Sequence, residues 1–227
     1  MTRKQLIELI QQHHASMGET EIRLALNRAQ DDYCAKTELI KTTYIQDSVA
    51  GKRYYTLDSQ ILKITKVQIN DVDIPRLIGI PIIDDDEFDA ETGLSAPSSS
   101  SNDRFWYIGN DRLGLVEKAA SAVTRDGRQS DYQSISEVKE IRIYAIAQAA
   151  DFTTDLTEVS EIPNQFHDAL VYKVISDAYL KAGTEVFNPQ VSQIFEGKYL
   201  ALVQNGKRKA RDNYISSGSA VIRPTDF

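Results

Sequence analysis

The residues with the clearest chemical potential form an acidic run near the middle of the chain. Six of the eight residues from Asp84 to Glu91 carry a carboxylate, a group that binds hard cations and can act as a general acid or base. A calcium loop of the EF-hand kind needs a ligand at its fifth position and glycine at its sixth, where this run has Phe88 and Asp89. We therefore predict a solvated acidic loop, with a loose Mg²⁺ or Ca²⁺ site and a specific electrostatic role as alternatives.

Other residue types with catalytic or metal-binding chemistry are few. The three histidines are His13, His14 and His167, and no Gly-x-Ser-x-Gly motif accompanies them. Adjacent side chains on a helix point about 100° apart, so His13 and His14 are poorly placed to share a metal ion. His167 has ordinary helix residues beside it, which favours a helix surface or an interface. The single cysteine, Cys34, excludes an intramolecular disulfide and is expected to be a buried or half-buried structural thiol. The sequence predicts no catalytic residue, metal site or cofactor.

Basic side chains gather toward the C-terminus. From Lys198 onward there are six basic residues and two acidic ones. A solvated helix end is one interpretation of this cluster, because cations stabilise the C-terminal end of a helix. Docking onto an acidic protein surface or onto DNA is the other. The segment Lys207–Phe227 is predicted to be an assembly arm that is ordered only against another chain. Residues 212–227 of this arm, which combine serine and glycine with apolar residues, are expected to be extended.

The elements that must position these residues are helical at both ends of the chain. Thr2 with Gln5, and Ser16 with Glu19, each fit a capping box. Apolar residues then recur on one helix face, at Ile22, Ala25, Leu26, Ala29 and Tyr33.

The C-terminal third is also predicted to be helical. One helix begins at Pro163. Another has Asn188 as its cap and Pro189 at its first helical position, and it ends or frays at Gly206. The apolar face of this second helix is expected to contain Val191, Ile194, Phe195 and Leu202.

Between these helices the pattern changes to short strands. Residues 53–57 and 61–69 are rich in aromatic and β-branched residues, and Asn70-Asp71 supplies a turn. Phe105–Val116 indicates a hairpin with a short loop. The polar stretch Thr124–Ser136 is expected to interrupt the sheet, and residues 138–147 to complete it.

Composition limits the class of protein. The chain has 227 residues, 41% of them apolar and 26% charged, which is typical of a globular protein. Its formal charge of −7 disfavours a freestanding nucleic-acid binder. No segment approaches the roughly 20 apolar residues that span a bilayer, and the N-terminal residues do not have the pattern of a secretion signal.

These observations predict an α+β fold, in which a helical bundle from both termini carries an inserted small antiparallel β subdomain. The expected parts are residues 1–43 and 151–211 for the bundle, 44–150 for the β subdomain with its acidic and serine-rich loop at 84–103, and 212–227 for the arm.

The order of several segments carries a family resemblance. These segments are Tyr54–Ile64 followed by Val67, Phe105–Val116, Ile141–Tyr144 continuing to Ile162–Tyr172, and Phe195–Tyr199. They look like a first strand pair, a central hairpin, a strand leading to a proline-started helix, and a final helix. The chain thus resembles the head-to-tail connector, or adaptor, proteins of tailed bacteriophages.

The resemblance implies a virion subunit without enzymatic activity or cofactor, assembled in the host cytoplasm and located in the neck between head and tail. It implies a homo-oligomeric ring, commonly a dodecamer, below the portal protein. The ring extends the channel through which phage DNA passes without sequence-specific binding, and it offers a platform for tail or other neck proteins. No membrane is involved.

On this hypothesis, two groups of residues have a role. Expected contacts with the portal protein or a neighbouring subunit are Lys207, Arg208, Lys209, Arg211, Tyr214, Val221, Ile222 and Phe227. The expected acidic rim or channel loop holds Asp84, Asp85, Asp86, Glu87, Asp89 and Glu91. Alternatives are another neck or tail-completion ring, a carboxylate-based hydrolase that uses the acidic run, and a DNA-binding factor that uses the basic cluster.

Overall fold

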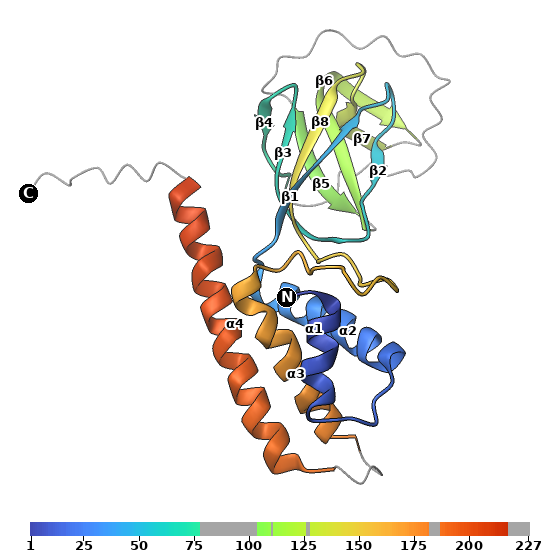
Figure 1. Cartoon of the computed structure of the whole chain (residues 1–227). Coiled ribbons are helices and arrows are strands. Elements are labelled where there is room, and N and C mark those ends of the chain that lie inside the picture. The colour runs from blue at the N-terminus through green and yellow to red at the C-terminus, as the bar shows by residue number, and fades with distance from the viewer. Residues whose placement is uncertain (78–103, 110, 126–127, 182–186, 218–227) are drawn as a thin grey trace, which may run out of the picture. The chain divides into compact units, whose positions relative to one another are not determined.

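The computed structural model describes residues 1–77, 104–109, 111–125, 128–181 and 187–217. The chain forms two compact units, one of Met1–Lys41 with Ile146–Phe227 and the other of Thr42–Ala145. The first unit is helical and the second contains the β-strands (Figure 1). The α+β class predicted from the sequence is therefore confirmed.

The helical unit contains α1 (Arg3–Gln11), α2 (Glu19–Thr37), α3 (His167–Tyr179) and α4 (Pro189–Ser217), with a short 3-10 helix, η2 (Asn164–Phe166), before α3. Helix α3 packs against each of the other three, and α2 also contacts α1 and α4. Their shared core includes Leu6, Ile10, Leu26, Tyr33, Leu170, Val174, Phe195 and Tyr199.

Local hydrogen bonds decide where the first two helices begin. The Thr2 backbone N–H donates to Gln5 Oε1 at 2.9 Å, and the Gln5 N–H donates to Thr2 Oγ1 at 3.4 Å. The predicted capping box at α1 is thus confirmed. The predicted box of Ser16 and Glu19 is wrong, because the N-cap of α2 is Gly18, which has no side chain to accept a hydrogen bond.

Helix α2 buries more than its predicted apolar face. The apolar residues at Ile22–Tyr33 pack into the core as expected. Asn27 and Gln30 are buried as well, although they are polar and lie outside the predicted apolar face. Asn27 Oδ1 accepts from the Phe152 N–H at 3.0 Å, and Gln30 Nε2 donates to the Ala150 carbonyl at 3.2 Å. These amides satisfy the backbone of the segment that returns from the β unit.

The β unit contains two sheets. One has the strand order β1 (Lys41–Asp47), β8 (Glu140–Ala147), β3 (Ile61–Ile69) and β4 (Val72–Ile74). The other has the order β2 (Tyr54–Thr56), β6 (Arg112–Arg125) and β5 (Arg104–Gly109), with β7 (Arg128–Ser134) also paired to β6. The core of the β unit includes Tyr55, Val67, Trp106, Leu113, Leu115, Ile135, Ile141 and Ile143.

Two turn predictions in this unit are confirmed, and one loop prediction is wrong. Asn70 and Asp71 both have positive φ, at 48° and 63°, and join β3 to β4. The hairpin pairs Phe105 with Val116 in an antiparallel register. The polar stretch Thr124–Ser136 does not interrupt the sheet, because most of it forms the end of β6 and strand β7. Backbone pairing along β6 stabilises these residues without an apolar sequence pattern.

Helix α4 is longer than the sequence predicts. The expected end at Gly206 is wrong, because the helix continues to Ser217. The expectation of an arm that is ordered only against another chain, and extended from Asp212, is wrong for residues 207–217, which belong to this helix. A Cβ atom at position 206 would lie 2.4 Å from Tyr33 Oη and 2.8 Å from Thr37 Cγ2. Glycine is therefore present here so that α4 can approach α2 closely. The remaining arm residues, 218–227, lie outside the described residues.

Replacing each of the two glycines of α4 by alanine is expected to change the stability of the protein in opposite directions. We expect Gly206→Ala to destabilise the protein by about 1 kcal/mol or more, because overpacking at the buried Tyr33 exceeds the gain in helix propensity. Position 197 is open, since a Cβ there meets no atom within 4 Å. Gly197→Ala should therefore stabilise it by up to about 1 kcal/mol. Urea unfolding of both variants checks this, and a stabilised Gly206→Ala variant would contradict the close approach.

A candidate docking surface on helix α4

Helix α4 begins as the sequence predicts. The N–H of Val191 donates to Asn188 Oδ1 at 3.2 Å, and Pro189 occupies the first helical position. Asparagine is a favourable N-cap, and proline fixes a helical φ where no N–H partner is needed. The helix continues for 29 residues, which is about 43 Å at 1.5 Å per residue.

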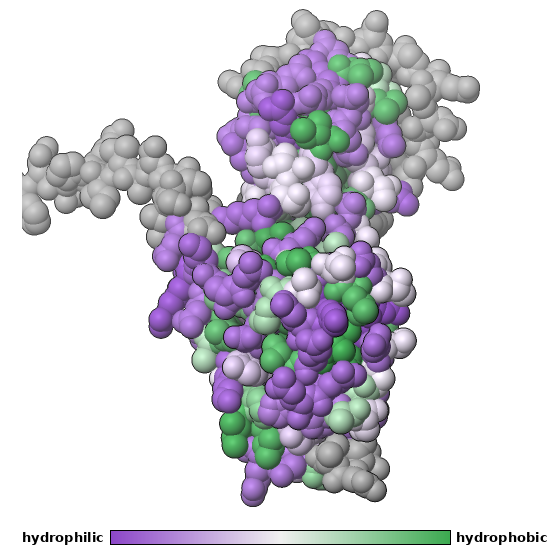
Figure 2. Space-filling model, in the orientation of Figure 1, coloured by the Kyte–Doolittle hydropathy of each residue, from purple (hydrophilic) through white to green (hydrophobic). Residues whose placement is uncertain are grey.

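One side of α4 is buried and the other is open. The buried residues recur at intervals of three or four, and they are Ser192, Phe195, Tyr199, Val203 and Gly206. Ile194 was predicted to share this face, and that prediction is wrong because it is 59% exposed. Figure 2 shows hydrophobic residues over the N-terminal half of α4 and a hydrophilic surface over its C-terminal half.

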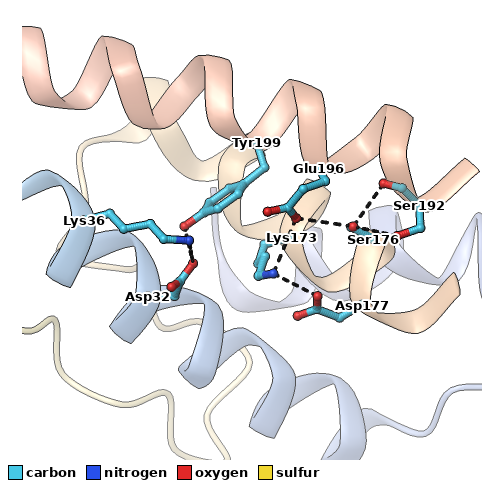
Figure 3. A network of polar contacts seen from close by, with 8 residues as sticks. All are labelled: Asp32, Lys36, Lys173, Ser176, Asp177, Ser192, Glu196 and Tyr199. Carbon is cyan, nitrogen blue, oxygen red and sulfur yellow. Dashed lines mark hydrogen bonds and ion pairs between the residues drawn. The ribbon is translucent and has the colours of Figure 1, made fainter. Parts of the chain in front are cut away.

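A network of polar side chains holds α4 against α2 and α3 (Figure 3). Tyr199 Oη donates to Asp32 Oδ2 at 2.6 Å, and Lys36 Nζ donates to the same oxygen at 2.7 Å. On the α3 side, Lys173 Nζ lies 2.9 Å from Asp177 Oδ1 and 3.4 Å from Glu196 Oε2. The network is completed by Ser176, whose hydroxyl donates to the Ser192 carbonyl at 3.1 Å.

The charges in this network are stabilised by their neighbours. Burial opposes ionisation of Asp32, but hydrogen bonds from Lys36 and Tyr199 outweigh it and lower the pKa of this carboxyl below its usual 3.8. Burial likewise opposes the charge of Lys173, yet Asp177 and Glu196 raise its pKa. Burial and the adjacent Asp32 raise the pKa of Tyr199, so the phenol remains a donor. Sequence reasoning missed this network, because its members lie far apart along the chain.

Beside the fixed helix lies a surface groove with a volume of about 380 Å³. Phe166 and Leu202 form its apolar lining, and Arg208 and Lys209 contribute positive charge. Its polar lining residues are Gln165, Asn205 and Asp212. An apolar surface beside guanidinium and ammonium groups is suited to an acidic segment that also presents an apolar side chain.

Four residues of the predicted basic cluster lie within about one and a half turns of α4. Arg208, Lys209 and Arg211 are exposed and Lys207 is half-buried. No ion pair of these four residues is seen with any other part of the chain that the structure describes. Their charge is therefore directed to solvent or to a partner.

The remaining predicted site residues are placed only in part. The backbone of Tyr214 belongs to α4. Residues Val221, Ile222 and Phe227 lie outside the described residues, as does the whole acidic run Asp84–Glu91.

The comparison with protein families decides the class. The model of the SU10 adaptor protein family matches residues 1–223. The chain belongs to the SU10 adaptor protein family. The resemblance to phage head-to-tail adaptors seen in the sequence is thus confirmed, and the chain is a structural adaptor of a phage virion. A comparison of the adaptor with curated proteins found no match.

Two residues of the adaptor with reactive side chains, His167 and Cys34, are buried in the fold. His167 is fully buried, so its predicted surface or interface position is wrong, and its Nε2 lies 2.7 Å from the Ile162 carbonyl oxygen. Its Nδ1 lies 2.8 Å from the Met1 amino nitrogen. Burial lowers the pKa of His167. Cys34 is buried as predicted, and burial raises its pKa to about 11.

One buried charge in the β unit was not predicted. Glu117 of β6 is fully buried, and its Oε1 accepts from Ser136 Oγ at 3.0 Å and from Gln133 Nε2 at 3.2 Å. Arg104 Nε lies 3.7 Å from its Oε2. Among the described residues, no group of three or more histidine, cysteine or acidic residues is arranged to hold a metal ion. None of the described helices is long and apolar enough to cross a membrane.

The lowered pKa of Asp32 predicts that the contact of α4 with α2 stabilises the folded protein to an extent that depends on pH. The folded state releases this proton more readily than the unfolded state, so the stabilisation is present above about pH 3.8 and is lost at lower pH. Asp32→Asn should remove it at pH 6.5, at a cost of about 1 kcal/mol, because the pair is partly exposed. Urea unfolding at pH 6.5 and pH 3 measures the difference.

Tyr199→Phe is the matched control for this prediction, because it removes one hydrogen bond and keeps the carboxylate of Asp32. Equal pH dependence in the wild type and Asp32→Asn would contradict this role.

Proposed function

We propose that this adaptor forms a ring below the portal protein in the virion neck, where it extends the DNA channel and supports tail or other neck proteins. The observation that carries the proposal is the exposed basic groove on α4, held in place by the polar network with α2 and α3. Membership of an adaptor family over residues 1–223 supports it. No catalytic step is part of the proposal.

The groove suits an acidic partner surface. Arg208 offers a planar guanidinium that can bind a carboxylate through two hydrogen bonds, and Lys209 adds a compact charge beside it. The apolar Phe166 and Leu202 next to them allow a buried anchor. We assign this surface to contact with the portal protein or with a neighbouring subunit.

The ring itself requires contacts between unlike surfaces of neighbouring copies. Ile194 and Leu200 on the open side of α4 are 59% and 44% exposed, which suits residues covered in an assembly. We expect twelve copies, assembled in the host cytoplasm. The net charge of −7 is compatible with a channel wall, because DNA affinity comes mainly from cations that neutralise phosphates. Another neck or tail-completion ring is the alternative.

Imaging of assemblies tests this function. We expect negative-stain images of the purified chain with portal particles to show a ring at the portal vertex. The double variant Arg208→Glu with Lys209→Glu should lose most of this binding, and the wild-type complex should weaken as salt is raised, because the contact is charge-assisted.

A matched control keeps this result specific. Lys4→Glu with Arg28→Glu makes the same change in net charge at exposed positions of α1 and α2. We expect this control to bind portal particles as the wild type does. Binding to another neck component, with none to portal particles, would favour the alternative ring, and equal loss in both double variants would contradict a role for the groove.

The acidic run supplies a separate test. We propose that Asp84–Glu91 lies at a solvent-facing rim or lines the channel, because so many carboxylates are costly to bury without basic partners. The triple variant of Asp84→Asn, Asp85→Asn and Asp86→Asn should fold and form rings as the wild type does. DNA retention in particles should change if the run lines the channel and stay constant if it lies on an outer rim. Loss of ring formation would place the run in a subunit interface.

A further inference from the structure

A second groove lies within the β unit, between the edge of one sheet and the edge of the other. Its volume is about 300 Å³. Consecutive residues line both sides, Tyr44–Gln46 of β1 on one and Thr56–Asp58 at the end of β2 on the other. Ile61 and Ile143 complete the lining. Because successive strand residues point to opposite faces, a groove lined by three in a row follows the strand edge itself.

Both strands have a free side among the described strands. Strand β1 pairs with β8 alone, and β2 pairs with β6 alone. The outer backbone N–H and C=O groups of an edge strand can pair with an added strand. The groove therefore presents backbone donors and acceptors as well as side chains.

Strand β1 lacks the features that usually protect an edge. Its charges are confined to its two ends, Lys41 and Asp47, and the residues between them are uncharged and contain no proline. Ile45 is 61% exposed at the middle of this strand. An uncharged edge with an exposed β-branched residue is a suitable template for strand addition.

One residue that lines the groove has a polar atom with no partner among the described residues. Gln46 Nε2 is buried and makes no hydrogen bond within the described chain. Buried amide donors are nearly always satisfied. A turn of the Gln46 side chain toward the groove would let this amide donate to a carbonyl of an added segment.

The C-terminal segment of the chain has the chemistry of such a strand. Beyond the end of α4, a short stretch of glycine and serine leads to Ala220-Val221-Ile222-Arg223, and Pro224 follows. Valine and isoleucine favour strands, and the proline ends pairing. Arg223 is complementary in charge to Asp58 of the groove. The ten residues after Ser217 span at most about 36 Å when extended.

We propose that the groove between β1 and β2 accepts residues 220–223 of a second copy of this chain as an added β-strand. Each copy has one groove and one C-terminal segment, so the contact is between unlike surfaces and can repeat around a closed ring. This inference rests on the ring of the proposed function, and it assigns the surfaces that join neighbouring copies.

Disulfide trapping in the full-length chain tests the contact. Ile45→Cys is combined with Val221→Cys, and separately with Ile222→Cys, because a shift of one residue turns a side chain to the other face. Upon mild oxidation we expect a ladder of linked multimers from at least one pair. The native Cys34 is buried and should not contribute. The control, Val72→Cys with Val221→Cys, places the first cysteine on β4, at the far edge of the same sheet and 41% exposed. It should give at least tenfold less product.

The outcomes separate this inference from the proposed function. A link within one chain, equal linking in the Val72 control, or no link in rings that are visible by negative stain would overturn the strand contact and leave the ring intact. Absence of rings in the wild type would instead overturn the function. Ile45→Lys provides a second measurement, because a charge on an exposed edge opposes strand addition. It should reduce ring formation at least tenfold without changing the urea midpoint, and unchanged ring formation would contradict the proposal.

Discussion

The close contact of α4 with α2 is the constraint on which the helical unit depends. At Gly206 the two helices approach so closely that a Cβ atom would overlap Tyr33. Seven residues earlier, the fully buried Tyr199 donates its hydroxyl hydrogen to Asp32 on α2. Because one contact depends on shape and the other on a charged hydrogen bond, the helix is fixed in both distance and register. A buried tyrosine without this acceptor would leave a costly unsatisfied hydroxyl.

This fixed helix determines what the C-terminal half of α4 can do. Four basic residues on a flexible tail would be a diffuse positive charge, but on a packed helix they keep defined positions. Two of them, Arg208 and Lys209, line the groove together with Phe166 and Leu202. Defined positions lower the entropy lost when a partner binds. The arrangement suits an adaptor, whose contacts must be selective although its net charge is negative.

The β unit offers a different kind of surface. Its buried charge, Glu117, is satisfied by neighbouring side chains, and its apolar residues form a core of their own. Among the described strands, the two that border the 300 Å³ groove each have an outer edge that pairs with no other strand. A charged helix surface and a strand edge differ in chemistry, so they suit different kinds of partner.

Local patterns were sufficient for several parts of this structure. The spacing of apolar residues in Ile22–Tyr33, the capping pair Thr2 and Gln5, and the Asn188-Pro189 start of α4 act over a few residues, so the sequence by itself determined them. The same holds for the hairpin of Phe105–Val116 and for the clustering of basic residues near the C-terminus. The order of these segments was enough to indicate the adaptor family.

The tertiary structure decided what depends on distant residues. Gly206 resembles a helix end until Tyr33 is placed beside it, and His167 resembles a surface residue until Ile162 and the amino group of Met1 surround it. The polar pairing of Tyr199 with Asp32 joins residues 167 positions apart. Patterns in sequence report local geometry, whereas burial and hydrogen-bond partners depend on which helices and strands the whole chain brings together.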